Sequence, residues 1–180
     1  MPRTPDDLQA RVDAVRLLVL DVDGVLTDGS IVYSDSGEEL KRFHVRDGSG
    51  LKLWALAGMR TAILSGRSSP AVSRRAAELG IEVVLQGRSD KLAALAEILA
   101  ATGCAASQSC AIGDDLQDLP LLNAAAVAVA VADACPEVRR IADYVTATPG
   151  GRGAARDLVE WLLKRQGRWD DLITSDRPAG

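Results

Sequence analysis

Short runs of apolar residues alternate along this 180-residue chain with segments of helical periodicity. Within the runs, polar and apolar positions do not alternate, which is typical of parallel strands that are covered on both faces. We therefore expect buried strands at residues 16–22, 60–65, 81–86, 109–114 and 127–132.

Between these runs, apolar side chains recur at the spacing of one helix face. In the segment 92–99, Leu92, Leu95, Ala96 and Leu99 follow the i, i+3, i+4, i+7 pattern. Strand and helix patterns in alternation predict an α/β, Rossmann-like fold with a parallel sheet between helices. Further helical faces are formed by Leu51, Trp54 and Ala55, by Val72, Ala76 and Leu79, and by Leu158, Trp161 and Leu162.

One segment departs from this alternation. Residues 29–45, "GSIVYSDSGEELKRFHV", contain two strand-like stretches separated by a turn signal at residues 35–37, and this predicts a short β-hairpin directly after the first strand. The distance to the next strand leaves room for this hairpin and one helix, but not for a large cap domain. We expect an N-terminal extension at 1–14, one domain at 15–167 and a flexible C-terminal tail at 168–180.

Composition narrows the class of protein. Aromatic residues make up only 3% of the chain, the net charge is −4, and lysines and arginines form no run, so a nucleic-acid groove is not expected. No apolar run approaches the ~18 residues of a membrane span, and the N-terminus lacks the apolar core of a signal peptide. Cys104, Cys110 and Cys135 form no CxxC pair and are expected to be free thiols in the cytoplasm.

Acidic residues follow two of the predicted strands, at the sheet edge where open α/β folds bind ligands. Asp21 and Asp23 end the first strand, and Asp114 follows a later one. Carboxylates that lie close together repel each other unless a cation lies between them, and Mg²⁺ fits oxygen ligands of this kind. Because alternate side chains of a strand point to opposite sides, Asp21 and Asp23 should differ in role. One would bind metal and attack, while the other reaches the leaving group and offers the metal only its carbonyl.

Groups that bind phosphate follow two other strands. Ser65 and Gly66 supply a hydroxyl and turn amides, and Lys91 supplies an ammonium at the start of a helix. Each motif alone has an ordinary explanation, as a turn, a solvated lysine or a helix cap. Their occurrence in order at the strand ends of one domain predicts phosphoryl transfer through an aspartyl-phosphate.

These segments resemble the four motifs of the haloacid dehalogenase superfamily. "DVDGVLTDG", "ILSGR", the lysine of "DKL" and "IGDDLQD" occur in the family's order. The resemblance implies that Asp21 is the nucleophile, that Asp23 is the general acid and base, and that Ser65 and Lys91 bind phosphate. Mg²⁺ would be held by Asp21, the Asp23 carbonyl and Asp114, with Asp115 and Asp118 supporting these ligands.

Longer segments resemble one branch of that superfamily, the 3-deoxy-D-manno-octulosonate 8-phosphate (KDO 8-phosphate) phosphatase family. They include "GEELKRFHVRDGSGLKLW", "VAVADACPEVRRIADYVT" and "GGRGAARDLVEWLL", and the likeness covers residues 17–168. The resemblance implies that the protein hydrolyses KDO 8-phosphate in lipopolysaccharide precursor synthesis. It also implies that the protein lacks a large cap domain and forms a homotetramer in which neighbouring subunits cover each other's active sites. It also implies that the segment 150–157 reaches toward an active site, whereas residue pattern alone equally allows a flexible loop before the last helix.

The sugar needs a partner for its carboxylate, and arginine suits this role because its guanidinium forms paired hydrogen bonds. By resemblance Arg46 in "VRDG" is the first candidate, followed by Arg67 and Arg152. Members of the family commonly have the tripeptide GQS shortly before the phosphate-binding lysine, where this chain has Gly87, Arg88 and Ser89. Arg88 would either contact an anion or face solvent. Because of this departure, a nine-carbon ulosonate 9-phosphate is an alternative substrate. His44, the only histidine, is assigned no role.

Two further alternatives belong to other classes of protein. A receiver domain also combines acids, a hydroxyl, a lysine and Mg²⁺, but its phosphoacceptor ends the third strand and it has no such hairpin. A non-catalytic relative retained for oligomerisation would have no need of the complete set Asp21, Asp23, Ser65, Lys91 and Asp114.

Overall fold

The computed structural model describes residues 7–174, and within them six parallel strands form one sheet in the order β5-β4-β1-β6-β7-β8. Each strand predicted from the sequence is present close to its expected position. The strands of the sheet are β1 (Leu17–Leu20), β4 (Arg60–Leu64), β5 (Val83–Leu85), β6 (Ser109–Gly113), β7 (Val127–Ala130) and β8 (Tyr144–Val145).

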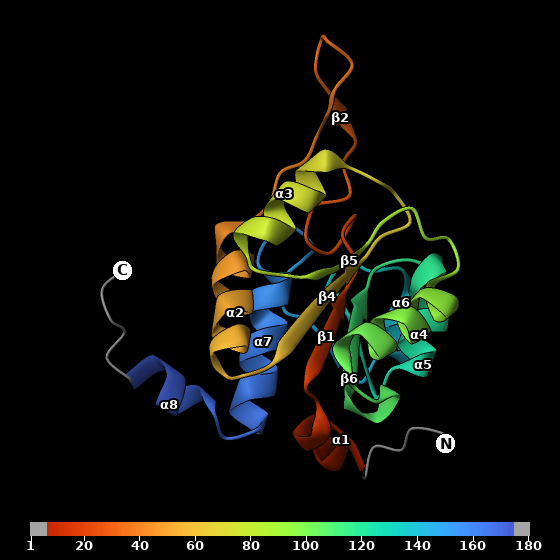
Figure 1. The fold of residues 1–180 in the computed structure, drawn as a ribbon. Coiled ribbons are helices and arrows are strands. Elements are labelled where there is room, and N and C mark those ends of the chain that lie inside the picture. The colour runs from red at the N-terminus through yellow and green to blue at the C-terminus, as the bar shows by residue number, and fades with distance from the viewer. Residues whose placement is uncertain (1–6, 175–180) are drawn as a thin grey trace.

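Helices cover both faces of this sheet (Figure 1), as the apolar strands require. Helices α2, α3 and α7 lie on one face and α4, α5 and α6 on the other. The buried core between the layers consists mainly of Leu, Val, Ile and Ala. The helices are α1 (Leu8–Ala14), α2 (Val45–Leu56), α3 (Pro70–Glu78), α4 (Lys91–Thr102), α5 (Leu119–Ala124), α6 (Pro136–Ile141), α7 (Ala154–Arg165) and α8 (Trp169–Thr174).

The predicted hairpin is formed by β2 (Val32–Tyr33) and β3 (Glu39–Leu40), which pair antiparallel with Val32 opposite Leu40. It projects beyond the body of the molecule (Figure 1). Between β1 and α2 the described chain contains this hairpin and no cap domain. The hairpin exposes the large apolar side chains of Ile31, Val32, Tyr33 and Leu40.

Short helices lie at both ends of the described chain. The predicted flexible tail contains α8, where Arg156 and Lys164 lie over the ring of Trp169, 5.3 and 5.1 Å from its centroid. The N-terminal extension contains α1, and its Arg11 donates to Asp143 and to the Ala126 carbonyl. Both helices are therefore bound to the domain. The remaining parts of these two expectations, at 1–6 and 175–180, lie outside the described residues.

The strand order determines where a site can form. β1 lies between β4 and β6, and the chain builds one half of the sheet outward from β1 before crossing to the other half. Ligands of open α/β sheets bind at such a switch point, beyond the carboxyl ends of the strands. The residues that follow β1, β4 and β6 therefore lie side by side. Within residues 7–174, no helix is long and apolar enough to cross a membrane.

Candidate active site

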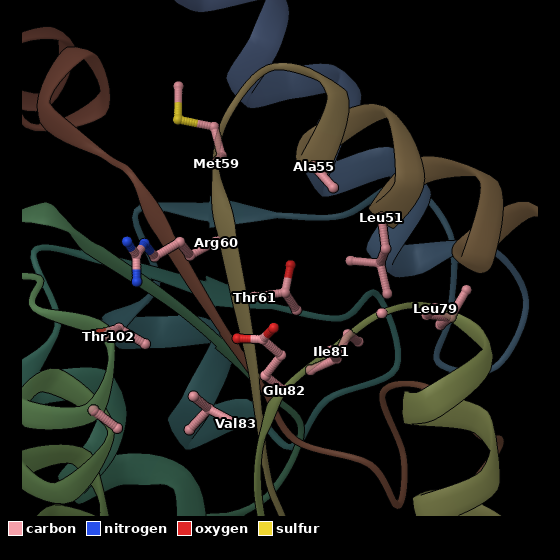
Figure 2. Close-up of a pocket in the computed structure, with 12 residues that line it drawn as sticks. Leu51, Ala55, Met59, Arg60, Thr61, Leu79, Ile81, Glu82, Val83 and Thr102 are labelled. Atoms are coloured by element: carbon pink, nitrogen blue, oxygen red, sulfur yellow. The ribbon is translucent and has the colours of Figure 1, made fainter.

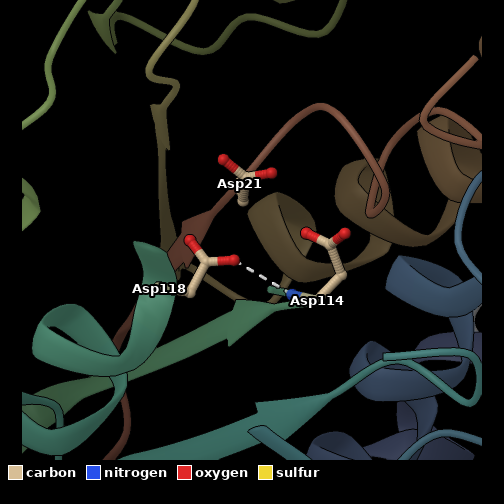
Figure 3. A group of neighbouring side chains, drawn as sticks. All are labelled: Asp21, Asp114 and Asp118. Atoms are coloured by element: carbon tan, nitrogen blue, oxygen red, sulfur yellow. Dashed lines mark hydrogen bonds between the residues drawn. The ribbon is translucent and has the colours of Figure 1, made fainter. Parts of the chain in front are cut away.

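Asp21, the candidate nucleophile, lies near Asp114 because the strands that precede them, β1 and β6, are neighbours in the sheet. β1 pairs with β6 with Leu20 opposite Ile112, so Asp21 and Asp114 leave the same edge of the sheet. Gly24 allows the close approach of Asp114, because a Cβ at this residue would overlap the Asp114 carboxylate. Its φ of +102° also favours glycine. Figure 3 shows the carboxylates of Asp21, Asp114 and Asp118 around a common space.

Lys91 is buried within this acidic group. Its ammonium donates to Asp21 Oδ1 at 2.6 Å and also to Asp118 Oδ1. Burial lowers the pKa of Lys91, but the charges of Asp21 and Asp118 outweigh burial and the pKa is raised. Lys91 thus keeps its positive charge at the edge where an anion would bind.

The carboxylates of Asp21 and Asp114 meet the requirements of a cation site. Asp21 Oδ2 and Asp114 Oδ1 are buried and have no hydrogen-bond partner among the described residues. Burial, followed by neighbouring carboxylates, raises the pKa of Asp114 to about 7, and burial and Asp118 likewise raise the pKa of Asp21. A divalent cation would both satisfy the two oxygens and offset the repulsion.

Asp118 also lies within reach of a cation at this position, since oxygens of Asp21, Asp114 and Asp118 lie within 4.8 Å of one another. Its own oxygens are already engaged, however. Oδ2 accepts from the Asp114 amide at 3.0 Å (Figure 3) and from the Asp115 amide at 3.3 Å. Oδ1 accepts from Lys91. Asp118 therefore holds the Asp114 loop in place. Asp115 is exposed and caps a short 3₁₀ turn by accepting from the Leu116 amide at 2.8 Å.

The Asp23 carboxylate points away from this cluster. Lys41 Nζ donates to its Oδ1, and the Ser65 hydroxyl approaches its Oδ2 at 3.4 Å. Its side chain is 20% exposed, whereas Asp21 is buried. The two acids of the DxD motif thus have different partners and different access to solvent, as expected, although β1 ends at Leu20 and both acids lie after the strand.

The predicted phosphate-binding residues flank the two acids. Ser65 is buried at the end of β4, its hydroxyl accepts from the Arg67 amide at 3.1 Å, and the following residue, Gly66, is exposed. Lys91 is the first residue of α4, and Asp90 caps this helix by accepting from the Ala93 amide at 2.9 Å. A phosphoryl group beside Asp21 would therefore meet a hydroxyl, an ammonium and a helix N-terminus.

Sequence reasoning missed two residues of the hairpin, Glu39 and Lys41. Lys41 Nζ contacts both Asp23 and Glu39, the latter at 2.9 Å, and the other oxygen of Glu39 accepts from Arg67 at 2.5 Å. The residues are two positions apart, so they share one side of an extended segment. Their spacing in the sequence indicates that the two charged side chains lie on the same side of the hairpin. It does not indicate that this side faces the acids, because charged side chains of a hairpin normally face solvent.

The three candidate substrate arginines do not lie together. Arg46 and Arg152 line one cavity of about 390 Å³ that also includes Arg156 and Thr148. Arg67 does not line it and instead binds Glu39 of the hairpin.

Two other residues that the sequence left unassigned have local roles. Arg88 forms paired hydrogen bonds to Glu97, at 2.9 and 2.8 Å. His44 caps α2, where its Nδ1 accepts from the Arg46 amide at 3.3 Å. Both contacts join the side chain to a helix of the same chain, and neither involves the acidic cluster.

The glycine-rich segment 150–157 packs against the loop that carries Asp21 and Asp23. A Cβ on Gly150 would overlap the Gly24 carbonyl, and the Gly151 amide donates to the Val25 carbonyl at 2.9 Å. The segment then enters α7, whose Arg156 amide donates to Asp47 at 3.0 Å. It thus both reaches the site and begins the last long helix of the domain.

Another cavity, of about 270 Å³, lies at the opposite ends of β4 and β5 (Figure 2). Its lining includes Arg60, Thr61 and Val83, which are at or near the starts of these strands. None of the candidate site residues lines it, so this cavity is separate from the acidic cluster.

Comparison with known proteins gives concordant results. The model of the haloacid dehalogenase-like hydrolase family matches residues 80–157. A protein of Escherichia coli named 3-deoxy-D-manno-octulosonate 8-phosphate phosphatase is 44% identical over 165 residues, which cover 92% of this chain and 88% of that protein. This chain is also similar to solved structures of proteins named as octulosonate 8-phosphate phosphatases.

The Moraxella catarrhalis structure, a complex with magnesium ion, phosphate ion and KDO, matches with a TM-score of 0.90 and 40% identity, over 94% of this chain and 98% of that one. The cobalt-bound structure from Haemophilus influenzae matches with a TM-score of 0.84 and 42% identity, over 87% and 92% of the two chains.

Proposed function

Because this chain belongs to the 3-deoxy-D-manno-octulosonate 8-phosphate phosphatase family of the haloacid dehalogenase-like hydrolases, we propose that it is an Mg²⁺-dependent phosphatase of KDO 8-phosphate. The observation that carries the proposal is the pair of unsatisfied buried oxygens on Asp21 and Asp114 beside the ammonium of Lys91. A dianionic phosphate ester needs a cation and a fixed positive group at its point of attack.

The proposed reaction has two steps. The Asp21 carboxylate attacks phosphorus, the bond from phosphorus to the sugar oxygen breaks, and Asp23 gives its proton to that oxygen. Asp23 then takes a proton from water as the water oxygen attacks the aspartyl-phosphate, which frees phosphate and restores Asp21. The buried Asp21 and the partly exposed Asp23 suit these roles, since only the second must exchange protons with sugar and water.

Mg²⁺, held by the carboxylates of Asp21 and Asp114 and by the Asp23 carbonyl, would supply positive charge that draws the phosphate and Asp21 together. The Ser65 hydroxyl, the Gly66 amide and the Lys91 ammonium would hold the phosphoryl oxygens as charge spreads over them. Asp118 and Asp115 keep the Asp114 loop in position through their hydrogen bonds.

For the sugar carboxylate we propose arginine contacts. Arg67 lies two residues after Ser65. It binds Glu39, Glu39 binds Lys41, and Lys41 binds Asp23, so among the three candidate arginines Arg67 is the one linked by contacts to a proposed catalytic acid. Arg46 and Arg152 share a cavity and would bind a more distant part of the substrate. We expect the Arg67→Ala substitution to raise KM for KDO 8-phosphate more than the Arg46→Ala substitution does.

We also propose that the protein is a homotetramer in which neighbouring subunits cover the sites. Support comes from the exposed apolar side chains of the hairpin, since apolar patches of this kind mark surfaces that a partner covers. Covering excludes water and strengthens electrostatic interactions in an uncapped site. Light scattering should give four times the chain mass of 19.0 kDa, and Tyr33→Glu should lower it.

We further propose that the enzyme works in the cytoplasm. Cys104, Cys110 and Cys135 form no disulfide within the described residues, and cysteines outside disulfides are usual where the surroundings are reducing. Fractionation of the native host with an antibody against this chain would test this placement.

The test of the reaction is phosphate release from KDO 8-phosphate, with Mg²⁺ and with a chelator. We expect Mg²⁺-dependent turnover by the wild type and none by Asp21→Asn, which keeps the side-chain shape but removes the nucleophile. A nine-carbon ulosonate 9-phosphate is the comparison substrate, and a higher kcat/KM for it would overturn the substrate assignment. Acetyl phosphate labelling without turnover would contradict the reaction itself.

A further inference from the structure

Lys41 occupies an unusual position for a hairpin lysine. Only 3% of its side chain is exposed, although β3, directly before it, belongs to a hairpin that projects from the domain. Its ammonium contacts Asp23 Oδ1 and, at 2.9 Å, Glu39 Oε1. The four methylene groups of a lysine are seldom buried this far unless its ammonium has charged partners.

We propose that Lys41 is a positioning residue for Asp23 and that the hairpin thereby takes part in the proton transfers of the reaction. The inference rests on the proposed function, in which Asp23 exchanges a proton with the leaving oxygen and then with water. It assigns a role to a residue that the sequence motifs leave unassigned.

The orientation of the Asp23 carboxylate supports this role. Lys41 holds Oδ1, which leaves Oδ2 facing the Ser65 hydroxyl at 3.4 Å. Ser65 is a proposed phosphate-binding residue, so Oδ2 is the Asp23 oxygen that faces the proposed phosphate site. A proton donor must lie about 2.6–3.2 Å from the atom it serves, and a free carboxylate can rotate away from such a position.

Lys41 is itself held in place. Glu39 binds Lys41 with one oxygen and accepts from Arg67 with the other, at 2.5 Å. Arg67 lies in the loop after β4, and its amide donates to Ser65 at 3.1 Å. The contacts therefore run from Asp23 through the hairpin and back to the phosphate-binding loop. Each acid of the DxD motif has its own lysine, with Lys91 on Asp21 and Lys41 on Asp23.

An ion pair can also serve stability alone, so the experiment must separate the two roles. Lys41→Met removes the ammonium and keeps most of the apolar stem. We expect kcat for KDO 8-phosphate to fall about 10- to 100-fold with little change in KM, because small misplacements of a catalytic group can cost about 10²-fold.

A second substrate provides the decisive comparison. In p-nitrophenyl phosphate the leaving phenolate is stable without a proton, so its release in the first turnover does not need Asp23 as an acid. We expect Lys41→Met to reduce this first-turnover release far less than turnover of the sugar phosphate, and Asp23→Asn to show the same selectivity. Lys41→Arg, which restores the positive charge, should recover most of the lost kcat.

Lys52→Met is the matched control, since Lys52 is an exposed lysine on α2. It should behave as the wild type on both substrates. If Lys41→Met does not fold, as judged by thermal melting, Glu39→Gln serves in its place with the same expected selectivity, because it loosens Lys41 without touching Asp23.

Equal losses on both substrates, or a rise in KM at unchanged kcat, would overturn the positioning role. Failure of the wild type to release phosphate from KDO 8-phosphate would instead contradict the proposed substrate. In that event the variants are compared on any alkyl phosphate that the wild type hydrolyses, so the two outcomes remain distinct.

Discussion

Lys91 Nζ lies 2.6 Å from Asp21 Oδ1, and neither side chain is more than 2% exposed. The pair joins the start of α4 to the end of β1, 70 residues apart in the chain. An ion pair removed from water this completely needs both partners, since each alone would be a buried charge.

Lys91→Met should therefore destabilise the protein. Loss of one partner of a buried ion pair typically costs about 3–5 kcal/mol. Because Asp21 can take up a proton once Lys91 is absent, the loss should be larger at alkaline than at acidic pH. Urea unfolding measures both effects, and a change within about 0.5 kcal/mol at every pH would contradict the prediction.

Without metal, the stability of the wild type should fall as pH rises through the range in which Asp114 titrates. The pKa of Asp114 is raised from 3.8 to about 7 by burial and then by nearby carboxylates. Between these values the folded protein holds a proton that the unfolded chain has released, so the stabilisation present at low pH is lost on the way to about pH 7. Asp114→Asn cannot ionise and should show a weaker decline in its urea midpoint, whereas parallel curves would exclude this cause.

Magnesium should have its largest effect at the alkaline end of that range. The cation and protons compete for Asp21 and Asp114, so binding weakens as pH falls below about 7. At a hundredfold excess over its Kd, a ligand of the folded state adds about 2.7 kcal/mol. Thermal melting should show this rise for the wild type but not for Asp114→Asn, with sodium chloride at equal ionic strength as the control.

Gly24→Ala should abolish both the magnesium response and activity. The new Cβ would overlap the Asp114 carboxylate and displace a proposed metal ligand. Gly37→Ala is the matched control, since Gly37 also has a positive φ of +81° but has open space around it. Both variants carry the cost of left-handed backbone, about 1–2 kcal/mol, so only the difference between them reports the overlap. Equal metal responses in the two variants would argue against the Asp114 position described above.

Much of the fold was predictable because the information is local. The apolar runs that became β1, β4, β6 and β7 are continuous, and strands buried on both faces require such runs. β8 has two residues and α5 and α6 have six each, so none of them shows a periodicity of its own, and all three were missed. The two-residue strands of the hairpin were found because a turn signal lies between them. α8, at the start of the C-terminal tail, was also not predicted, and its Trp169 lies beneath Arg156 and Lys164 of α7.

The sequence by itself determined the residues that follow each strand and therefore most of the composition of the candidate site. Parallel strands place their carboxyl ends at one edge, so Asp21, Ser65, Lys91 and Asp114 could be grouped without coordinates. Only the tertiary structure decided which groups touch. Lys41 reaches Asp23, Arg67 is separated from Arg46, and Gly150 packs on Gly24, because the paths of the hairpin and of the loop before α7 bring them there. Periodicity reports which face of an element is buried, but a contact between distant segments depends on how their backbones cross in space.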